Sequence, residues 1–334
     1  MFLVTFHGGS GGIPSLYSYN DDGSGGSAYF TPGTGEQGLR DVQFLPAASG
    51  GQLDVVNSYK KSSQIWQFSP GSQPASPVVS GPGGSGTTIC SVYHPFAIAF
   101  DGPMNVCYVS NQDTNVVVRL YGTGSAANAW QPMPINTALP SSSTSYLPGT
   151  FVASQVALSG PDCSVPPTVS SKDGGLSTKP SKLSPTDTPK NSVRGVAVIG
   201  NTLYVADEPD NSIRMYDTLL GTYLGKLSDP SNLIRSPTHL LVHDCLLFVT
   251  IADSVLCFDP SQQKLTTIIS GLKAPSGITF DGSGNFYVCE RTSLQVLQYN
   301  SAFQPAPSNP FIPQSGQMPD EPEFILWVNN SWLG

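Results

Sequence analysis

Residues 193–217, VRGVAVIGNTLYVADEPDNSIRMYD, contain three apolar stretches separated by two polar turns. The first stretch ends at Gly200, the second ends at Asp207, and the third carries an aromatic residue, Tyr216, near its end. Short apolar or alternating runs bounded by Gly, Asn and Asp indicate β-strands that are joined by tight turns. This segment therefore predicts three consecutive antiparallel strands.

The same arrangement recurs four more times along the chain. Each segment has an apolar strand, a turn, an alternating strand, a polar turn and a strand with a late aromatic residue. The four segments are 38–68 (GLRDVQF, then LDVVNSYKKSSQIWQF), 94–121 (HPFAIAF, then NVCYVSNQDTNVVVRLY), 237–258 (PTHLLV, then CLLFVTIADSVLCF) and 275–299 (PSGITF, then GNFYVCERTSLQVLQY). Repeated small antiparallel sheets are typical of β-propellers, in which the sheets form a ring of blades.

The two ends of the chain supply one further blade. Residues 322–328, PEFILWV, match a first strand, and residues 2–6, 15–20 and 27–30 match the three strands that follow it. A sheet shared between the termini removes the open edges of a repeat array. We therefore predict that residues 1–334 form one all-β domain, a six-bladed β-propeller of four-stranded antiparallel blades, closed by pairing N-terminal strands with a C-terminal strand. A seven-bladed ring is the alternative.

The alternative arises from a long interval between two of the repeats. Residues 137–191 fill this interval and are rich in Ser, Thr and Pro. Between 159 and 191 the sizeable apolar side chains are Val165, Val169, Leu176 and Leu183, too few to cover the face of a blade. We therefore interpret 137–191 as a Ser/Thr/Pro-rich insertion within the domain, mobile or glycosylated, and not as a seventh blade.

The turns between the second and third strands carry a resemblance to a known family. Residues 204–217 (YVADEPDNSIRMYD) and 108–122 (YVSNQDTNVVVRLYG) place an acidic or amide residue after the second strand. This pattern resembles the NHL repeat, and the chain is similar to the NHL-repeat or TolB-like superfamily of six-bladed β-propellers. The resemblance covers most of the chain outside 137–191. It implies the fold but leaves the function open, because such propellers include enzymes and pure binding modules.

Composition excludes two classes of partner. The net charge is −8 and the sequence has no basic run, so the chain lacks the cationic surface that nucleic-acid binding needs. No stretch approaches 18 uninterrupted apolar residues, so a membrane span is not predicted. The N-terminal sequence MFLVTFHGGSGG has no cationic start and soon reaches glycine, which predicts a strand and not an intact secretory signal peptide.

The residues that begin the innermost strands are the candidate ligand-binding group. Innermost strands surround the central channel of a propeller, so the polar residues at their start converge near its axis. By alignment of the repeats these residues are Arg40, Asp41, Phe96, Arg194, Thr238, His239, Ser276 and Glu323. The charged members could bind a small anionic or polyhydroxylated ligand through charge-assisted hydrogen bonds. Alternatively, Arg40, Arg194, Asp41 and Glu323 pair with one another and plug the channel.

A divalent metal in the channel is the alternative functional hypothesis. Six-bladed propellers of the calcium-dependent gluconolactonase type hold a metal through a Glu that starts a first strand and through Asn and Asp from other blades. The resemblance implies Glu323, Asn111 and Asp207 as ligands of Ca or Zn in a hydrolase or lactonase. Asn111 and Asp207 equally fit residues that cap a strand end by accepting backbone N–H bonds. A three-histidine zinc site is not predicted, since only His94 and His239 lie at blade entrances.

Two features concern covalent modification. Cys90 and Cys163 lie in polar loops that flank the same blade, and we predict a disulfide between them. Asn329 begins an Asn-x-Ser sequon and is a candidate for N-glycosylation. Both features fit an extracellular or cell-surface protein.

The sequence shows no motif that assembles a nucleophile, a base and an oxyanion site. We therefore predict a non-enzymatic, extracellular or surface-associated binding scaffold without a cofactor. Its loop faces would recognise a protein, a glycan or identical subunits. Charged residues are only 11% of the chain, so subunits could also stack into a filament or surface layer without strong repulsion. The metal-dependent hydrolase or lactonase remains the alternative.

Overall fold

The structure is a computed structural model of the chain. It describes residues 1–6, 16–30, 38–45, 51–58, 63–69, 71–72, 77–81, 91–102, 105–112, 114–122, 130–136, 139, 146–153, 193–314 and 318–329. Within this part of the chain, no apolar helix of membrane-spanning length occurs.

The described residues form strands throughout the chain. In order they are β1 (Phe2–Phe6), β2 (Leu16–Tyr19), β3 (Ser27–Phe30), β4 (Leu39–Leu45), β5 (Gln52–Asn57), β6 (Gln64–Phe68), β7 (Val79–Ser80), β8 (Pro95–Asp101), β9 (Val106–Asn111), β10 (Val116–Gly122), β11 (Trp130–Pro132), β12 (Thr150–Ala153), β13 (Val193–Ile199), β14 (Thr202–Asp207), β15 (Ser212–Asp217), β16 (Tyr223–Lys226), β17 (Leu240–His243), β18 (Leu246–Ile251), β19 (Ser254–Asp259), β20 (Lys264–Ser270), β21 (Pro275–Phe280), β22 (Phe286–Glu290), β23 (Gln295–Tyr299) and β24 (Pro322–Trp327).

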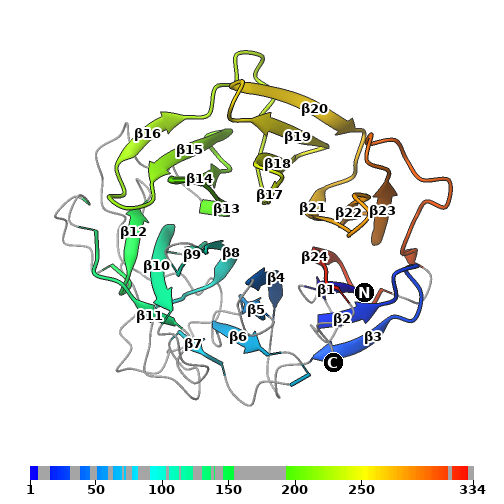
Figure 1. Ribbon diagram of the computed structural model, residues 1–334, viewed down its shortest axis with the longest axis horizontal. Helices are drawn as coiled ribbons and strands as arrows, with labels where there is room; N and C mark the ends of the chain where they lie inside the picture. The colour runs from blue at the N-terminus through cyan, green and yellow to red at the C-terminus, as the bar shows by residue number, and fades with distance from the viewer. Residues whose placement is uncertain are drawn as a thin grey trace, which may run out of the picture.

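These strands form six antiparallel sheets that stand around a common centre as the blades of a propeller (Figure 1). Blade 1 contains β24, β1, β2 and β3, and blade 2 contains β4 to β7. Blade 3 contains β8 to β12, blade 4 contains β13 to β16, blade 5 contains β17 to β20, and blade 6 contains β21 to β23. The first strand of each blade is innermost (Figure 1). The predicted six-bladed β-propeller is confirmed.

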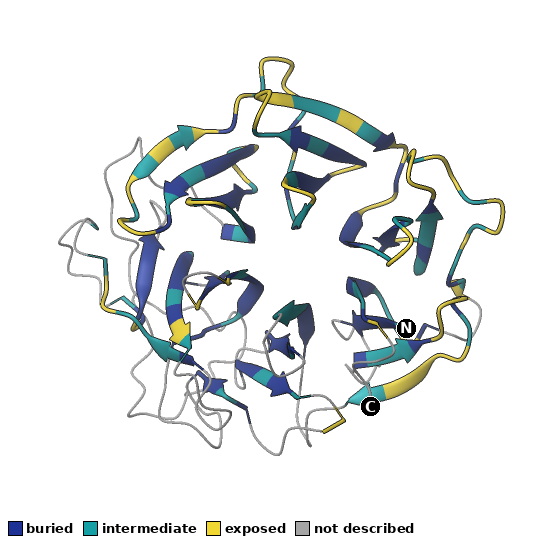
Figure 2. Cartoon of the chain, viewed as in Figure 1, coloured by how far each residue is buried: buried dark blue, intermediate teal, exposed yellow. Residues whose placement is uncertain are grey.

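The core of the protein lies between neighbouring blades. The second strands β9 and β22 are buried along their whole length and β14 along all but its first residue, whereas the outer strands β16 and β20 are largely exposed or half-buried (Figure 2). Side chains of a strand alternate between the two faces of its sheet, and here both faces meet another blade. This is why Tyr204 and Ala206 of β14 pack with Leu247 and Val249 of β18.

The two termini close the ring. In β1 and β24, Phe2 pairs with Trp327, Val4 with Ile325 and Thr5 with Phe324. The backbone N–H of Val328 also donates to the carbonyl of Met1 at 3.0 Å. The shared sheet of blade 1 was predicted from the sequence, and the structure confirms it.

Blades 3 and 6 differ from the four-stranded pattern. In blade 3, β11 and β12 both pair with β10, so this sheet has five strands. Blade 6 has three strands. Two isolated β-bridges, Val296 with Ile312 and Tyr299 with Pro305, pair its outer strand β23 with the segment that follows, where the other blades have a fourth strand.

The predicted insertion 137–191 includes residues that belong to blade 3. Leu147, Phe151 and Val152 are at most 2% exposed, and β12 pairs with β10. The difference from the predicted insertion lies at the start of the segment. There the short apolar strand TFVA at 150–153 stands in a stretch that its composition marks as polar. Residues 154–192 lie outside the described part of the chain.

Two glycines allow neighbouring innermost strands to approach closely. A Cβ atom on Gly277 of β21 would lie 2.3 Å from the Cα of Phe324 in β24. A Cβ atom on Gly195 of β13 would lie 2.7 Å from the carbonyl oxygen of Thr238, to which the Gly195 N–H donates at 2.7 Å. Only glycine fits such a contact, so these positions bring blades 6 and 1, and blades 4 and 5, together at the centre.

Candidate functional site

The candidate residues lie where the innermost strands begin with irregular pairing. In four blades the register shifts between Leu39 and Val42, Pro95 and Ile98, Val193 and Val196, and Pro275 and Ile278. Two residues of each strand therefore lie between the regular pairs, and successive side chains of a strand point in opposite directions. The first of these positions holds Arg40, Phe96, Arg194 or Ser276, one in each of the four blades. The second holds Asp41, Ala97, Gly195 or Gly277.

Three rings from different blades meet at the centre, and we call Phe96, Phe324 and His239 the axial aromatic cluster. The ring centroid of Phe324 is 5.8 Å from that of Phe96 and 4.6 Å from that of His239, in edge-on arrangements that aromatic pairs favour. The three residues belong to blades 1, 3 and 5, which are not neighbours. Each is at most 3% exposed. The cluster therefore fills the middle of the ring at this level.

His239 is held in this cluster as a neutral ring. Its backbone N–H donates to Thr250 Oγ1 at 3.0 Å, which fixes the start of β17. Its buried Nδ1 atom has no hydrogen-bond partner among the described residues. Burial lowers the pKa of His239 to about 3, because the charged form would lose its hydration.

One charged network adjoins the cluster and links blades 2, 1 and 6. Glu323 Oε1 lies 3.4 Å from Arg40 Nη1 and 3.4 Å from Arg291 Nε. Arg291 Nη2 is also 2.9 Å from Glu321 Oε2. Glu323 is 1% exposed, so its charge is stabilised by the two arginines that flank it.

A second network links blades 3 and 4. Arg194 Nε donates to Glu208 Oε2 at 2.7 Å, and Arg194 Nη1 donates to Gln112 Oε1. Gln112 Nε2 lies 3.2 Å from His94 Nδ1. The guanidinium carbons of Arg40 and Arg194 are 5.0 and 5.1 Å from the centre of the Phe96 ring, so both networks rest on this ring.

The other predicted channel residues bind neighbouring strands. Asp41 accepts the backbone N–H of Ile98 at 2.8 Å and Gln43 Nε2 at 3.1 Å, so it joins blade 2 to blade 3. Burial raises the pKa of Asp41 to about 7. Ser276 Oγ donates to the carbonyl of Pro322 at 2.9 Å and joins blade 6 to blade 1. Thr238 Oγ1 donates to the carbonyl of Ser236 at 3.1 Å.

The three candidate metal ligands each have partners of their own. Asn111 Oδ1 accepts the backbone N–H of Tyr93 at 2.7 Å, which is the capping arrangement weighed above. Asp207 Oδ2 accepts Arg214 Nε at 3.0 Å, and Glu323 lies between Arg40 and Arg291. Across the described residues, no group of three or more His, Cys, Asp or Glu side chains is placed to hold a metal ion. Each of the three residues thus has a structural partner of its own, and a metal site formed by them stays a prediction.

Capping residues recur at the same place in other blades. Asn57 Oδ1 accepts the N–H of Gly38 at 3.0 Å, and Glu290 Oε1 accepts the N–H of Lys273 at 2.8 Å. Like Asn111, each ends the second strand of its blade. The side chain thus fixes the chain entering the first strand of the same blade, as short polar side chains do at strand ends.

Sequence reasoning missed three members of the charged networks, Gln112, Glu208 and Arg291. Each directly follows the last residue of a second strand, at the point where that strand lies beside the start of the first strand. The sequence shows that the three residues occupy the same position in the repeat. It does not show that this position lies at the centre of the ring, because that depends on how the first and second strands pair.

Of the two predicted modification sites, one lies within the described residues and the other does not. Cys90 and Cys163 lie outside the described residues, and the disulfide between them stays a prediction. Asn329 is described and exposed, as a glycosylation acceptor must be. The free cysteines of the described part are Cys107, Cys245, Cys257 and Cys289.

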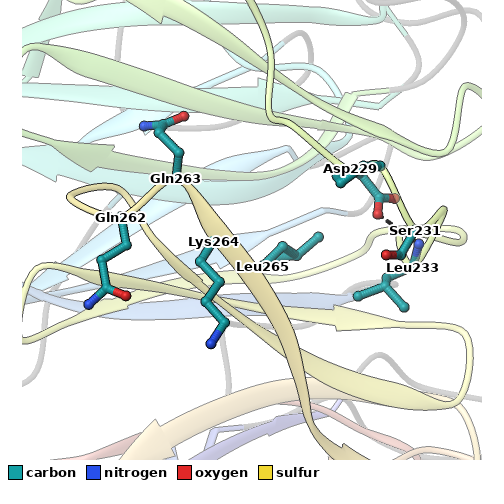
Figure 3. A pocket seen from close by; sticks show the side chains of 8 residues that line it. Asp229, Ser231, Leu233, Gln262, Gln263, Lys264 and Leu265 are labelled. Carbon is teal, nitrogen blue, oxygen red and sulfur yellow. Dashed lines mark hydrogen bonds between the residues drawn. The ribbon is translucent and has the colours of Figure 1, made fainter.

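A hollow of about 310 Å³ lies on the outer part of the propeller, where the connection between blades 4 and 5 meets the turn between β19 and β20 (Figure 3). We call it the rim hollow. It is lined by Asp229, Pro230, Ser231, Leu233, Gln262, Gln263, Lys264 and Leu265. Asp229 is engaged within its own turn, since its carboxylate accepts the N–H groups of Leu233 and Ile234 at 2.8 Å each.

Exposed apolar side chains gather on blades 3 and 4. In the described part of the chain, the large hydrophobic residues classed as exposed are Tyr121, Ile135, Leu219, Leu220 and Leu224. Arg119 joins the two blades here, because its Nη1 donates to the carbonyls of Thr218 and Leu219 at 3.0 Å each. Tyr121 lies two residues after Arg119 and shares its face of β10. Leu220 precedes Gly221, whose Cα lies close to the side chain of Asn136, the neighbour of Ile135.

We call Tyr121, Ile135, Leu219 and Leu220 the blade 3–4 patch. Leu219 and Leu220 are 62% and 64% exposed, yet their turn is tightly held. Asp217 Oδ1 accepts the N–H of Leu219 at 3.0 Å and that of Leu220 at 2.7 Å. Tyr108 Oη donates to the carbonyl of Thr218 at 3.0 Å. The two leucines are therefore presented to solvent by a rigid turn.

Comparison with known proteins shows likeness in fold alone. No protein-family model matches the sequence, and no curated protein matches it either. A chain from the crystal structure of a nidogen/laminin complex has a TM-score of 0.60 at 13% identity, covering 97% of each chain. A functionally unknown protein from Desulfotomaculum acetoxidans has a TM-score of 0.52 at 11% identity, covering 93% of this chain and 87% of that one. A catalytically inactive virginiamycin B lyase from Staphylococcus aureus with quinupristin has a TM-score of 0.47 at 9% identity, covering 88% of this chain and 75% of that one. The first two similarities agree with the β-propeller fold of the chain, and the NHL type of repeat remains a prediction.

Proposed function

We propose that this chain is a non-enzymatic binding propeller that recognises a protein partner through the blade 3–4 patch. The observation that carries the proposal is the rigid turn of Leu219 and Leu220, two adjacent leucines more than half exposed. Scattered single apolar residues are normal on a protein surface, whereas a cluster marks an interaction site. Here the exposed cluster spans two neighbouring blades.

The energy available at this patch is large enough to matter for binding. Fully burying one leucine side chain stabilises by about 1.5–3 kcal/mol relative to leaving it exposed. Binding loses part of this gain when flexible loops become ordered. The bonds from Asp217 and Arg119 order the turn in advance, so little of the gain is lost.

The central site supports the same proposal indirectly. Arg40, Arg194 and Arg291 each have a glutamate partner, and the aromatic cluster fills the space between their blades. A ligand that bound these arginines would have to replace their glutamate partners, so little free energy would be gained on binding. The geometry therefore favours the rim of the propeller over its centre as the binding surface.

The similarity to a chain of the nidogen/laminin complex is an analogy at the level of fold. It supports the proposal only in that a propeller of this shape is found in a complex of proteins. We also propose an extracellular or cell-surface location, which the exposed Asn329 and its sequon fit.

The proposal is tested with the double variant Leu219→Asp/Leu220→Asp, which makes the turn hydrophilic without touching the core. The matched control is Ser301→Asp/Ala302→Asp, which adds the same two charges at an adjacent exposed pair in the turn after β23, away from both the patch and the rim hollow. Proteins crosslinked to the wild-type and control chains but not to the patch variant are identified and purified. Their affinity for all three chains is then measured by calorimetry.

The expected result is a purified partner whose affinity for the patch variant falls by about 100-fold or more, since burying two leucine side chains stabilises a complex by about 3–6 kcal/mol. The control should bind like the wild type. The proposal is overturned if no partner depends on the patch, or if the purified partner binds the patch variant as tightly as the wild type.

A further inference from the structure

The blade 3–4 patch and the rim hollow have complementary shapes and polarity. The patch projects the side chains of Leu219 and Leu220 on a rigid turn. The hollow has apolar walls at Pro230, Leu233 and Leu265 and polar edges at Ser231, Gln262 and Gln263 (Figure 3). Its volume of about 310 Å³ is at the lower end of the roughly 300–1,000 Å³ of small-molecule pockets, which is room for one or two aliphatic side chains.

The charges beside the two surfaces are also complementary. Asp217 carries the negative charge at the base of the leucine turn. Lys264 lies at the hollow, is exposed, and has no ion-pair partner among the described residues. Asp229 on the opposite wall accepts two backbone N–H groups, as Asp217 does in the leucine turn. A leucine turn entering the hollow would thus bring Asp217 toward an available cation.

The two surfaces belong to different parts of the ring. The turn lies between β15 and β16 and contacts blade 3, whereas the hollow lies between blade 4 and blade 5. A projection and a cavity at separate places on one molecule allow one copy to insert into another.

We propose that the partner recognised by the blade 3–4 patch includes a second copy of this chain, whose rim hollow receives Leu219 and Leu220. This proposal rests on the proposed function, since both use the same leucine turn. It adds that the rim hollow is the receiving site and that the association is between identical subunits.

The experiment uses two classes of variant of the full chain. Leu219→Asp/Leu220→Asp removes the projection. Lys264→Glu reverses the charge at the hollow, and Ser231→Trp fills it; both positions are exposed, so the fold is retained. Lys273→Glu is the matched control, because it makes the same charge change at an exposed lysine outside the hollow. Association is measured by analytical ultracentrifugation over a range of protein concentrations.

The wild type and Lys273→Glu are expected to self-associate with the same dissociation constant. Ser231→Trp and the leucine variant should each weaken self-association by about 100-fold, and Lys264→Glu by about tenfold, as expected for a charge at the edge of an interface. A mixture of the leucine variant and Ser231→Trp should form a one-to-one heterodimer, because an intact projection then meets an intact hollow.

The outcomes separate this proposal from the proposed function. A wild-type chain that stays monomeric at 100 μM, taken here as roughly the weak end of specific association, overturns the self-association while leaving capture of another protein by the patch intact. Self-association that is lost in the leucine variant but unchanged in both hollow variants overturns the hollow as receiving site. Absence of the heterodimer in the mixture also contradicts the proposal. Circular dichroism of each variant verifies that the fold is retained.

Discussion

Phe324 in β24 meets His239, the residue before β17, edge-on, with ring centroids 4.6 Å apart, although blade 6 lies between their blades. The contact depends on a close approach of β21 and β24, where Gly277 faces the Cα of Phe324. The strand that closes the ring is therefore also the strand that supplies the central aromatic residue. Strand β24 thus both closes the ring and fills its centre.

Replacing Gly277 with alanine should weaken this closure. The new Cβ atom would lie 2.3 Å from Phe324 Cα and 2.7 Å from the Ile325 nitrogen, both backbone atoms that cannot yield cheaply. Overpacking of this kind costs about 1–3 kcal/mol. Urea unfolding should show this loss for Gly277→Ala and almost none for Gly102→Ala, where the added Cβ atom meets nothing within 4 Å. Equal stability of the two variants would contradict the close approach.

His239 should make the protein sensitive to acid. Its pKa is about 3 in the folded state and 6.5 ordinarily, so the unfolded chain binds more protons between these values. Stability is thus fully present above pH 6.5 and falls as the pH drops toward 3, by at most about 1.4 kcal/mol per pH unit. His239→Leu removes this dependence. Urea unfolding at pH 7.5 and at pH 4.5 should show the variant gaining on the wild type at the lower pH, and an unchanged difference would refute a buried neutral imidazole.

Asp54 should act in the opposite direction. Its carboxylate is buried and accepts Gln67 Nε2 at 2.9 Å and Trp130 Nε1 at 2.8 Å, and burial raises its pKa from 3.8 to about 7. The folded state then binds more protons between these values, so this group's contribution is full below pH 3.8 and is lost as the pH rises to 7.

Asp54→Asn keeps an acceptor for Trp130 but cannot ionise. We expect the variant to gain stability relative to the wild type between pH 4.5 and pH 8, by at most about 1.4 kcal/mol per pH unit crossed below 7. Thermal unfolding at the two pH values measures this. A relative loss at pH 8 would show that the charged carboxylate is favoured in the fold.

Asp207 is predicted to stabilise the protein through Arg214. Both side chains are at most 3% exposed and their atoms are 3.0 Å apart, so Asp207→Ala would leave a buried guanidinium without this partner. Breaking a buried pair costs about 3–5 kcal/mol. Arg214 Nη2 also lies 3.0 Å from Asp210, which keeps the expected loss near the lower end of this range. Lys226 pairs with the same Asp210 at the surface, and Lys226→Ala should cost no more than about 1 kcal/mol.

The same variants also test the metal hypothesis for Asp207. If Asp207 serves Arg214, the loss of stability in Asp207→Ala is the same in calcium and in EDTA. A wild-type melting temperature that falls in EDTA, together with a variant that does not respond, would instead assign Asp207 to a metal.

The repeat pattern was sufficient to predict the blades because each one is a local meander. The spacing of Gly200, Asp207 and Tyr216 defines three strands without any long-range information. Even the closure by β24 and β1 could be predicted, since the apolar run at 322–328 had no other place in a ring. Strand β12 of blade 3 could not be predicted, because Thr150–Ala153 is short and lies in a polar stretch.

The centre of the ring was less predictable than its blades. The sequence assigned Arg40, Arg194 and Glu323 to the centre. There the two arginines lie over the Phe96 ring, and Glu323 pairs with Arg40. Neither Phe324 as the central ring nor Arg291 as a partner of Glu323 was identified. The irregular pairing at the start of the inner strands decides which of two successive side chains faces the centre, and no local pattern reveals it.

The blade 3–4 patch could not be predicted from sequence either. Leu219 and Leu220 stand in a turn, but Arg119 and Asp217, which hold that turn, are known as its supports only from the structure.

Hydrogen exchange of the backbone amides of β1 and β24 is the most direct test of a ring closed by its two ends around a filled centre. We expect these amides to exchange only on global unfolding, with the same protection free energy as those of the inner strands β8 and β13. Rapid exchange in Pro322–Trp327 while the other blades stay protected would contradict it, because the ring would then be open at blade 1.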